Sequence, residues 1–164
     1  SREAKAFVEA MDLSVPLAAK REALLAALAE HARWLVACVS GRGVDRHLLG
    51  LRLAAAKAGL AAPAALSGAA YARSTDFALS TSNISVPGAP RERRWCDYGG
   101  FGAPTVSSYG VCYGIQPNAI SLLVACHAQD PLRCASRFGD AIRVAIRDVF
   151  ELLMLDAADG RAKL

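Results

Sequence analysis

The sequence lacks the short motifs by which many enzymes are identified. It contains no C-x-x-C pair, no G-x-S-x-G nucleophile elbow, no P-loop, no dinucleotide-binding fingerprint and no H-E-x-x-H. The usual local signatures of zinc sites, serine hydrolases and nucleotide-binding enzymes are therefore absent from the sequence. The sequence has five cysteines, an odd number: Cys38, Cys96, Cys112, Cys126 and Cys134. We therefore expect reduced thiols and no metal site.

Long apolar runs and concentrated charge are also missing. Stretches such as Leu122–Cys126 and Leu152–Leu155 are far shorter than the roughly 20 residues that cross a bilayer, so no transmembrane segment is expected. The start of the chain, Ser1–Lys5, has no apolar core of a secretory signal. The net charge of +4 is dispersed, and its densest cluster, Arg91–Trp95, lies in an expected loop. Nucleic-acid binding, which needs a basic stripe with exposed aromatics, is therefore not expected.

The remaining composition, 54% hydrophobic and 21% charged, suits one globular domain with its own core. Apolar spacing predicts helices over about 2–11, over 16–39 with Ser14 as cap, and from Asp45 to Gly59. From Phe77 the pattern alternates, which is typical of strands. We expect strands over 77–81, 109–115 and 119–125, the last two as a hairpin, and a final helix from Asp130-Pro131.

Several motifs together resemble the choline/carnitine acyltransferase family, in the order found there and over nearly the whole chain: Gly43–Leu51, Leu79–Ser82, Gly100–Gly102 and Tyr109–Tyr113. The resemblance implies an α/β, coenzyme A-dependent acyltransferase-like (chloramphenicol acetyltransferase-like) C-terminal domain, with a mixed β-sheet flanked by helices. It implies that residues 1–155 form this domain without its N-terminal half, and that residues 156–164 form a polar tail.

The implied reaction moves an acyl group between coenzyme A and the hydroxyl of carnitine, with acyl-CoA as co-substrate and no covalently bound cofactor. A histidine would act as general base. The resemblance implies that this base lies upstream, because His31, His47 and His127 do not match its position. We expect these three histidines to be packing or surface residues.

Arg46 is the most informative residue of the first motif. A guanidinium binds a carboxylate through two parallel hydrogen bonds, and carnitine differs from choline chiefly by a carboxylate. The resemblance implies arginine here in carnitine enzymes and asparagine in the choline enzyme. The alternative is a surface ion pair of Arg46 with Asp45 or Glu30. Asp45 is otherwise expected to cap the helix, with His47 packed behind it.

The triplet Ser80-Thr81-Ser82 predicts two hydroxyls on one face of a strand, with the middle one pointing away. The resemblance implies that Ser80 lies near the carnitine carboxylate and that Ser82 donates to the developing oxyanion. Asn83 stands where a glutamine near coenzyme A is usual. Without these neighbours, such a triplet would be an ordinary strand or turn.

The glycine-rich segment supplies two further candidates. The resemblance places Phe101 against the trimethylammonium group, where an aromatic face attracts a cation; ordinary core packing is the alternative. Gly99 stands where acetyl-specific members have a bulky side chain, which implies a medium- or long-chain acyl substrate. Besides Asn83, two further positions and one insertion, Arg91–Tyr98, depart from the family. Ser108 replaces a turn glycine, which predicts backbone strain or a shifted loop, and Ala125 replaces a serine beside the site.

The terminal Ala162-Lys163-Leu164 resembles the S-K-L address that the peroxisomal import receptor reads. We therefore expect a peroxisomal location, with a mitochondrial one as the alternative. Other functions also stay open. The chain could belong to a family member that binds acyl-carnitine or coenzyme A without turnover, or to a carnitine acetyltransferase, whereas Arg46 argues against the choline enzyme.

Overall fold

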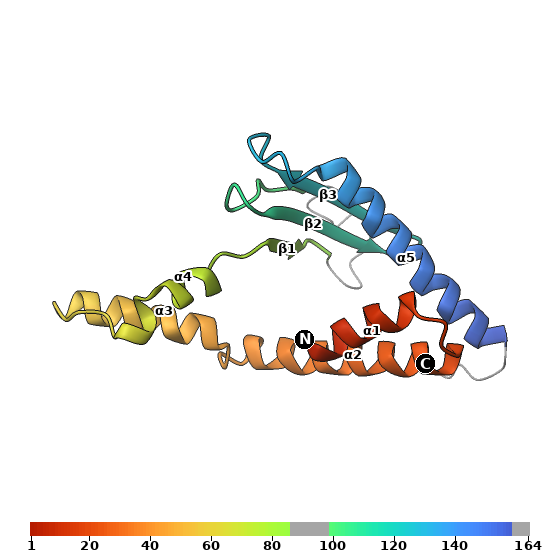
Figure 1. The fold of residues 1–164 in the computed structure, drawn as a ribbon, viewed down its shortest axis with the longest axis horizontal. Coiled ribbons are helices and arrows are strands. Elements are labelled where there is room, and N and C mark those ends of the chain that lie inside the picture. Colours follow the sequence, from red (N-terminus) through yellow and green to blue (C-terminus); the bar gives the residue numbers. More distant parts are fainter. Residues whose placement is uncertain (86–98, 159–164) are drawn as a thin grey trace. The chain divides into compact units, whose positions relative to one another are not determined.

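A computed structural model describes residues 1–85 and 99–158, with side chains through Leu155 (Figure 1). The chain divides into two compact units, one of residues 1–68 and 147–164 and the other of residues 69–146. The basic cluster Arg91–Trp95, the rest of the insertion up to Tyr98, and Ala162-Lys163-Leu164 lie outside the described residues. The boundary expected between domain and tail stays a prediction.

The first unit contains helices α1 (Arg2–Asp12), α2 (Leu17–Val39) and α3 (Val44–Lys57) and the short 3-10 turn η1 (Ala64–Leu66). Ser1 caps α1, because its hydroxyl accepts the Ala4 N–H at 3.1 Å. The bounds of α2 confirm the expected helix, but its N-cap is Pro16 and not Ser14. A turn at Gly41, whose φ of 72° favours glycine, separates α2 from α3.

The start of α3 differs from the expectation in two ways. Gly43 is the N-cap and provides no side-chain cap, whereas Asp45 lies within the first turn of the helix. There its negative charge still interacts favourably with the helix dipole. His47 is exposed and does not pack behind the helix.

The second unit contains α4 (Ala69–Ser74), strands β1 (Leu79–Asn83), β2 (Tyr109–Gln116) and β3 (Ala119–Cys126), and the first half of α5 (Ala135–Ala158). The strands form one mixed sheet in the order β1-β2-β3. β1 pairs with β2 in parallel, and β2 pairs with β3 in antiparallel fashion. The mixed α/β class and the hairpin are therefore confirmed.

The two faces of this sheet differ in side-chain size. On β2, Tyr109 and Val111 belong to the face covered by α5 (Figure 1), where Tyr109 stacks on Phe138 with ring centroids 4.3 Å apart. Val111 is only 4% exposed. The opposite face of β2 carries the small residues Gly110 and Gly114. Large residues thus anchor the helix on one side, and the other side is left open for a loop or a ligand.

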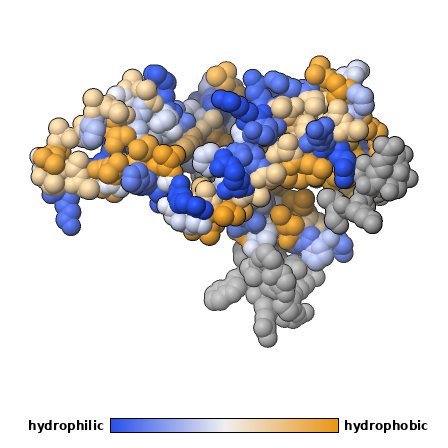
Figure 2. All heavy atoms as spheres, turned by 90° about the horizontal axis from the view of Figure 1, so that it is seen from below, coloured by the Kyte–Doolittle hydropathy of each residue, from blue (hydrophilic) through white to orange (hydrophobic). Residues whose placement is uncertain are grey.

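Many large apolar side chains remain exposed, and Figure 2 shows hydrophobic atoms beside charged ones over the face in view. One helical stretch, Leu17–Lys57, is long and apolar enough to cross a membrane by length and composition alone. The expectation of no transmembrane segment is therefore not confirmed. The stretch includes the Glu30–Arg33 ion pair at 2.7 Å, a costly group for a bilayer interior.

The hydroxyl of Tyr109 accepts the backbone N–H of Cys134 at 3.1 Å, just before α5 begins. We expect Tyr109→Phe to lower the free energy of unfolding by about 1 kcal/mol, because this N–H loses its partner while the ring stack is kept. Tyr113→Phe is the matched control, since its hydroxyl has no hydrogen-bond partner among the described residues. Denaturant unfolding of both variants measures the difference, and equal stabilities would contradict the assigned role.

Candidate functional site

The serine pair lies on the open face of the sheet. In the β1–β2 register Ser80 is opposite Gly110 and Ser82 is opposite Cys112, while Thr81 belongs to the other face. This confirms the expected alternation of the three hydroxyl residues. Within the part of the chain that the structure describes, neither serine hydroxyl has a hydrogen-bond partner. Both are therefore free to donate to a ligand.

The loop that follows the insertion packs over the same face of β2. A Cβ on Gly110 would lie 3.1 Å from Phe101 Cε2 and 3.3 Å from the Ala103 nitrogen. Only glycine allows this close approach. Phe101 is thus half-buried against the strand, directly beside the residue that faces Ser80. The structure brings Phe101, Ser80 and Ser82 together on one face.

Two glycines of this loop touch the sheet at different points. A Cβ on Gly100 would lie 2.7 Å from Leu123 Cδ1, so a side chain at Gly100 would force Leu123 to move. A Cβ on Gly99 would meet Ile84 Cδ1 at 3.4 Å and Cys112 Sγ at 3.6 Å. A methyl group at Gly99 would therefore make ordinary van der Waals contacts with Ile84 and Cys112.

The departure at Ser108 causes no backbone strain. No described residue other than glycine has positive φ, so the expected strain is wrong. Ser108 is fully buried, its hydroxyl donates to the Thr105 carbonyl at 2.9 Å, and it accepts the Thr105 N–H at 3.0 Å. The side chain closes the turn that a flexible glycine would otherwise make. The neighbouring His127 is also structural, since its Nε2 lies 2.9 Å from the Ala103 carbonyl.

The chain just after β1 is held by side-chain hydrogen bonds. Asn83 Oδ1 accepts the Ser85 N–H at 2.8 Å, and Ser85 Oγ accepts the Ile115 N–H at 2.5 Å. The Asn83 oxygen is therefore engaged in a turn, and its amide nitrogen is the atom left to meet a ligand. Sequence reasoning missed Ser85 and Ile84, because their contacts join residues about thirty positions apart.

Arg46 lies in the first turn of α3, in the other compact unit from the serine pair. It is exposed, and among the described residues no carboxylate pairs with it. The alternative partner Glu30 is occupied by Arg33, whose Nε and Nη2 donate at 2.8 and 2.7 Å. These hydrogen bonds lower the pKa of Glu30. The alternative considered for Arg46, an ion pair with Asp45 or Glu30, is therefore absent from the described part of the chain.

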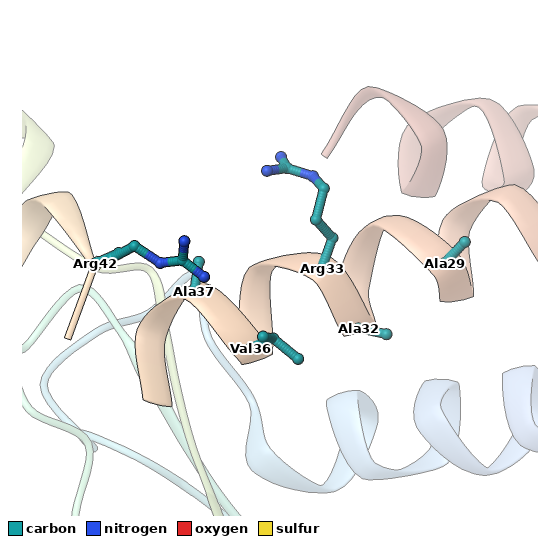
Figure 3. A pocket seen from close by; sticks show the side chains of 6 residues that line it. All are labelled: Ala29, Ala32, Arg33, Val36, Ala37 and Arg42. Carbon is teal, nitrogen blue, oxygen red and sulfur yellow. The ribbon is translucent and has the colours of Figure 1, made fainter. Parts of the chain in front are cut away.

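A hollow of about 660 Å³ lies over α2 and the turn after it, but it contains none of the candidate residues. Figure 3 shows its lining: Ala29, Ala32, Arg33, Val36, Ala37 and Arg42. A second hollow of about 680 Å³ lies between β3 and α5, on the sheet face opposite the serines. Neither hollow is lined by Ser80, Ser82 or Phe101.

Cys134 is a residue whose environment the sequence did not reveal. The Ser136 hydroxyl lies 3.2 Å from its sulfur, and the backbone N–H of Arg137 also interacts with it at the start of α5. The pKa of the Cys134 thiol lies below its ordinary value, first because of the Ser136 hydroxyl and then because of Arg137. Cys38, Cys112, Cys126 and Cys134 are free thiols.

Comparison with known proteins agrees with these motifs. A family model described as choline/carnitine O-acyltransferase matches residues 1–144. The chain belongs to the choline/carnitine O-acyltransferase family. Members of this family are acyltransferases that use acyl-CoA as co-substrate.

Relatives of this acyltransferase-family chain differ in their acceptor. Choline O-acetyltransferase of Danio rerio is 36% identical over 75% of the chain and 18% of the relative. Human mitochondrial carnitine O-palmitoyltransferase 2 is 36% identical over 69% of the chain and 16% of the relative. Carnitine O-acetyltransferase of Mus musculus is 30% identical over 93% of the chain and 24% of the relative. The chain spans roughly a fifth of the length of these relatives.

Proposed function

We propose that the chain provides the carnitine-binding and acyl-binding part of a carnitine O-acyltransferase. The observation that carries the proposal is Arg46 in the first turn of α3, which is exposed and has no ion-pair partner among the described residues. A cation near a helix N-terminus is unfavourable for the helix itself, so helix stability does not account for it. Gly43 provides no side-chain cap, and the free N–H groups of the first turn favour the same anion as the guanidinium.

Each remaining candidate takes a part in the proposed reaction. Ser80 donates to the carnitine carboxylate, and Phe101 covers the trimethylammonium group, which cannot form hydrogen bonds. Ser82 donates to the oxygen that becomes negative when the carnitine hydroxyl attacks the thioester carbonyl. The Asn83 amide nitrogen contacts coenzyme A. The general base is a histidine that these 164 residues do not include, because none of His31, His47 and His127 stands at the position that the family resemblance gives to the base.

The acyl group in this proposal is medium-chain or longer. Support comes from Gly99, which places no side chain beside Ile84 and Cys112 at the position where acetyl-specific members of the family have a bulky one. A clear preference of the intact protein for acetyl over octanoyl transfer would contradict this part of the proposal.

A choline acyltransferase is the second candidate, favoured by the 36% identity to the Danio rerio choline enzyme. Choline has no carboxylate, so Arg46 would have no anion to bind. A member that binds acyl-CoA or acyl-carnitine without turnover is separated from both by an assay of acyl transfer in the intact protein.

We expect Arg46→Asn in the intact protein to raise the KM for carnitine about 30-fold, because a charged hydrogen-bonded contact of about 2 kcal/mol is lost. The KM for acyl-CoA should stay the same. Arg42→Asn, an exposed arginine just before α3, is the matched control. Steady-state kinetics with carnitine and with choline measure both effects. An unchanged KM for carnitine, or choline preferred by the unaltered protein, would exclude the proposal.

We expect Ser82→Ala to lower kcat about 100-fold with little change in either KM, because the hydroxyl acts only when charge develops on the oxygen. Thr81→Ala removes a hydroxyl from the same strand but from the opposite face, and should leave kcat unchanged. Rapid-quench or steady-state measurement of acyl transfer distinguishes the two. A loss that appears in KM alone would assign Ser82 to substrate binding.

We further propose that the protein is imported into peroxisomes through Ala162-Lys163-Leu164. A fluorescent protein that ends in residues 156–164 should gather in peroxisomes of transfected cells, and the same fusion without Leu164 should stay diffuse. Retention of the full fusion in the cytosol, or its appearance in mitochondria, would contradict the proposal.

A further inference from the structure

Ile84 continues the row of side chains that begins with the serine pair. Its N–H donates to the Tyr113 carbonyl at 2.9 Å, so the pairing of β1 with β2 extends one residue past the strand. Alternation then places Ser80, Ser82 and Ile84 on one face, about 6.6 Å apart along the strand. The contact of Ile84 with Gly114, a residue of this same face, agrees with this order.

The side chain of Ile84 fills space that two glycines leave empty. Its Cδ1 and Cγ2 lie 3.4 and 3.5 Å from a Cβ placed on Gly99, and its Cγ1 lies 3.5 Å from a Cβ placed on Gly114. The sulfur of Cys112 borders the same space, 3.6 Å from the Gly99 position. Ile84 therefore borders the position that a side chain at Gly99 would occupy.

The position of Ile84 is fixed by its neighbours on both sides. Ser85 Oγ accepts the Ile115 N–H, and Asn83 Oδ1 accepts the Ser85 N–H. Together with the bond from Ile84 to Tyr113, these contacts attach residues 83–85 to β2. Ile84 is half-buried. Because residues 83–85 are hydrogen-bonded in this way, a ligand could not move Ile84 aside without breaking these bonds.

We propose that Ile84 forms the far wall of the acyl pocket and sets the upper limit on acyl length. The inference rests on the proposed carnitine acyltransfer. If carnitine binds at Ser80 and the reacting carbonyl lies at Ser82, the acyl chain leaves in the remaining direction along the strand, toward Ile84. Ile84, which lies against Gly99 and Gly114, then stops a longer chain.

The test is the acyl-length profile of the intact protein with acetyl-, octanoyl- and palmitoyl-CoA. Ile84→Ala should raise the ratio of kcat/KM for palmitoyl-CoA to that for octanoyl-CoA about tenfold or more, since each methylene group accommodated by a pocket is worth about that factor. Ile84→Val, which removes one methyl group and keeps the branched shape, should raise the ratio by less. Ile120→Ala is the matched control, because Ile120 lies on the opposite face of the sheet.

Each result decides a different point. An unchanged ratio in Ile84→Ala, or in Ile84→Val if the alanine variant does not fold, would overturn the inference while octanoyl transfer still supports the proposed function. Efficient palmitoyl transfer by the unaltered protein would also overturn it. Absence of acyl transfer to carnitine in the unaltered protein would overturn the proposed function, and the inference with it.

Discussion

The parallel pairing of β1 with β2 is the constraint on which the candidate site depends. Backbone hydrogen bonds at both ends hold the register, from the Tyr109 N–H to the Ala78 carbonyl and from the Ile84 N–H to the Tyr113 carbonyl, each at 2.9 Å. A slip of one residue would turn Ser80 and Ser82 toward the face that α5 covers. The orientation of both hydroxyls is therefore a property of the ladder and not of the serines alone.

Local periodicity was sufficient to predict the elements around this ladder. The hairpin strands and α2 agree with the expected ranges within a residue or two, because alternation and helical spacing are read directly from neighbouring residues. The final helix was placed too early. Asp130 accepts the Leu132 N–H and pairs with Arg133, which forms a turn, and α5 begins only at Ala135.

The packing of the site was less accessible to sequence reasoning. The alternation of the serines could be predicted, whereas the contacts of Ile84 with Gly99 and Gly114 join segments that are distant in the chain. Ser108 shows the same limit. It stands where the family has a glycine, so backbone strain was expected, but its hydroxyl instead closes the turn. The local sequence pattern predicts which face of an element a residue occupies, whereas the residues that it contacts there follow only from the fold.

The glycines that line this face give the site an unusual sensitivity to sequence change. At Gly100, Gly110 and Gly114 even a methyl group would lie about 3 Å or less from a neighbouring atom. At Gly100 and Gly114 the nearest atoms are the side-chain ends of Leu123 and Ser121, which can move, whereas at Gly110 they include the backbone of Phe101 and Ala103. Gly110 holds no functional group, yet a side chain there would displace the loop that carries Phe101.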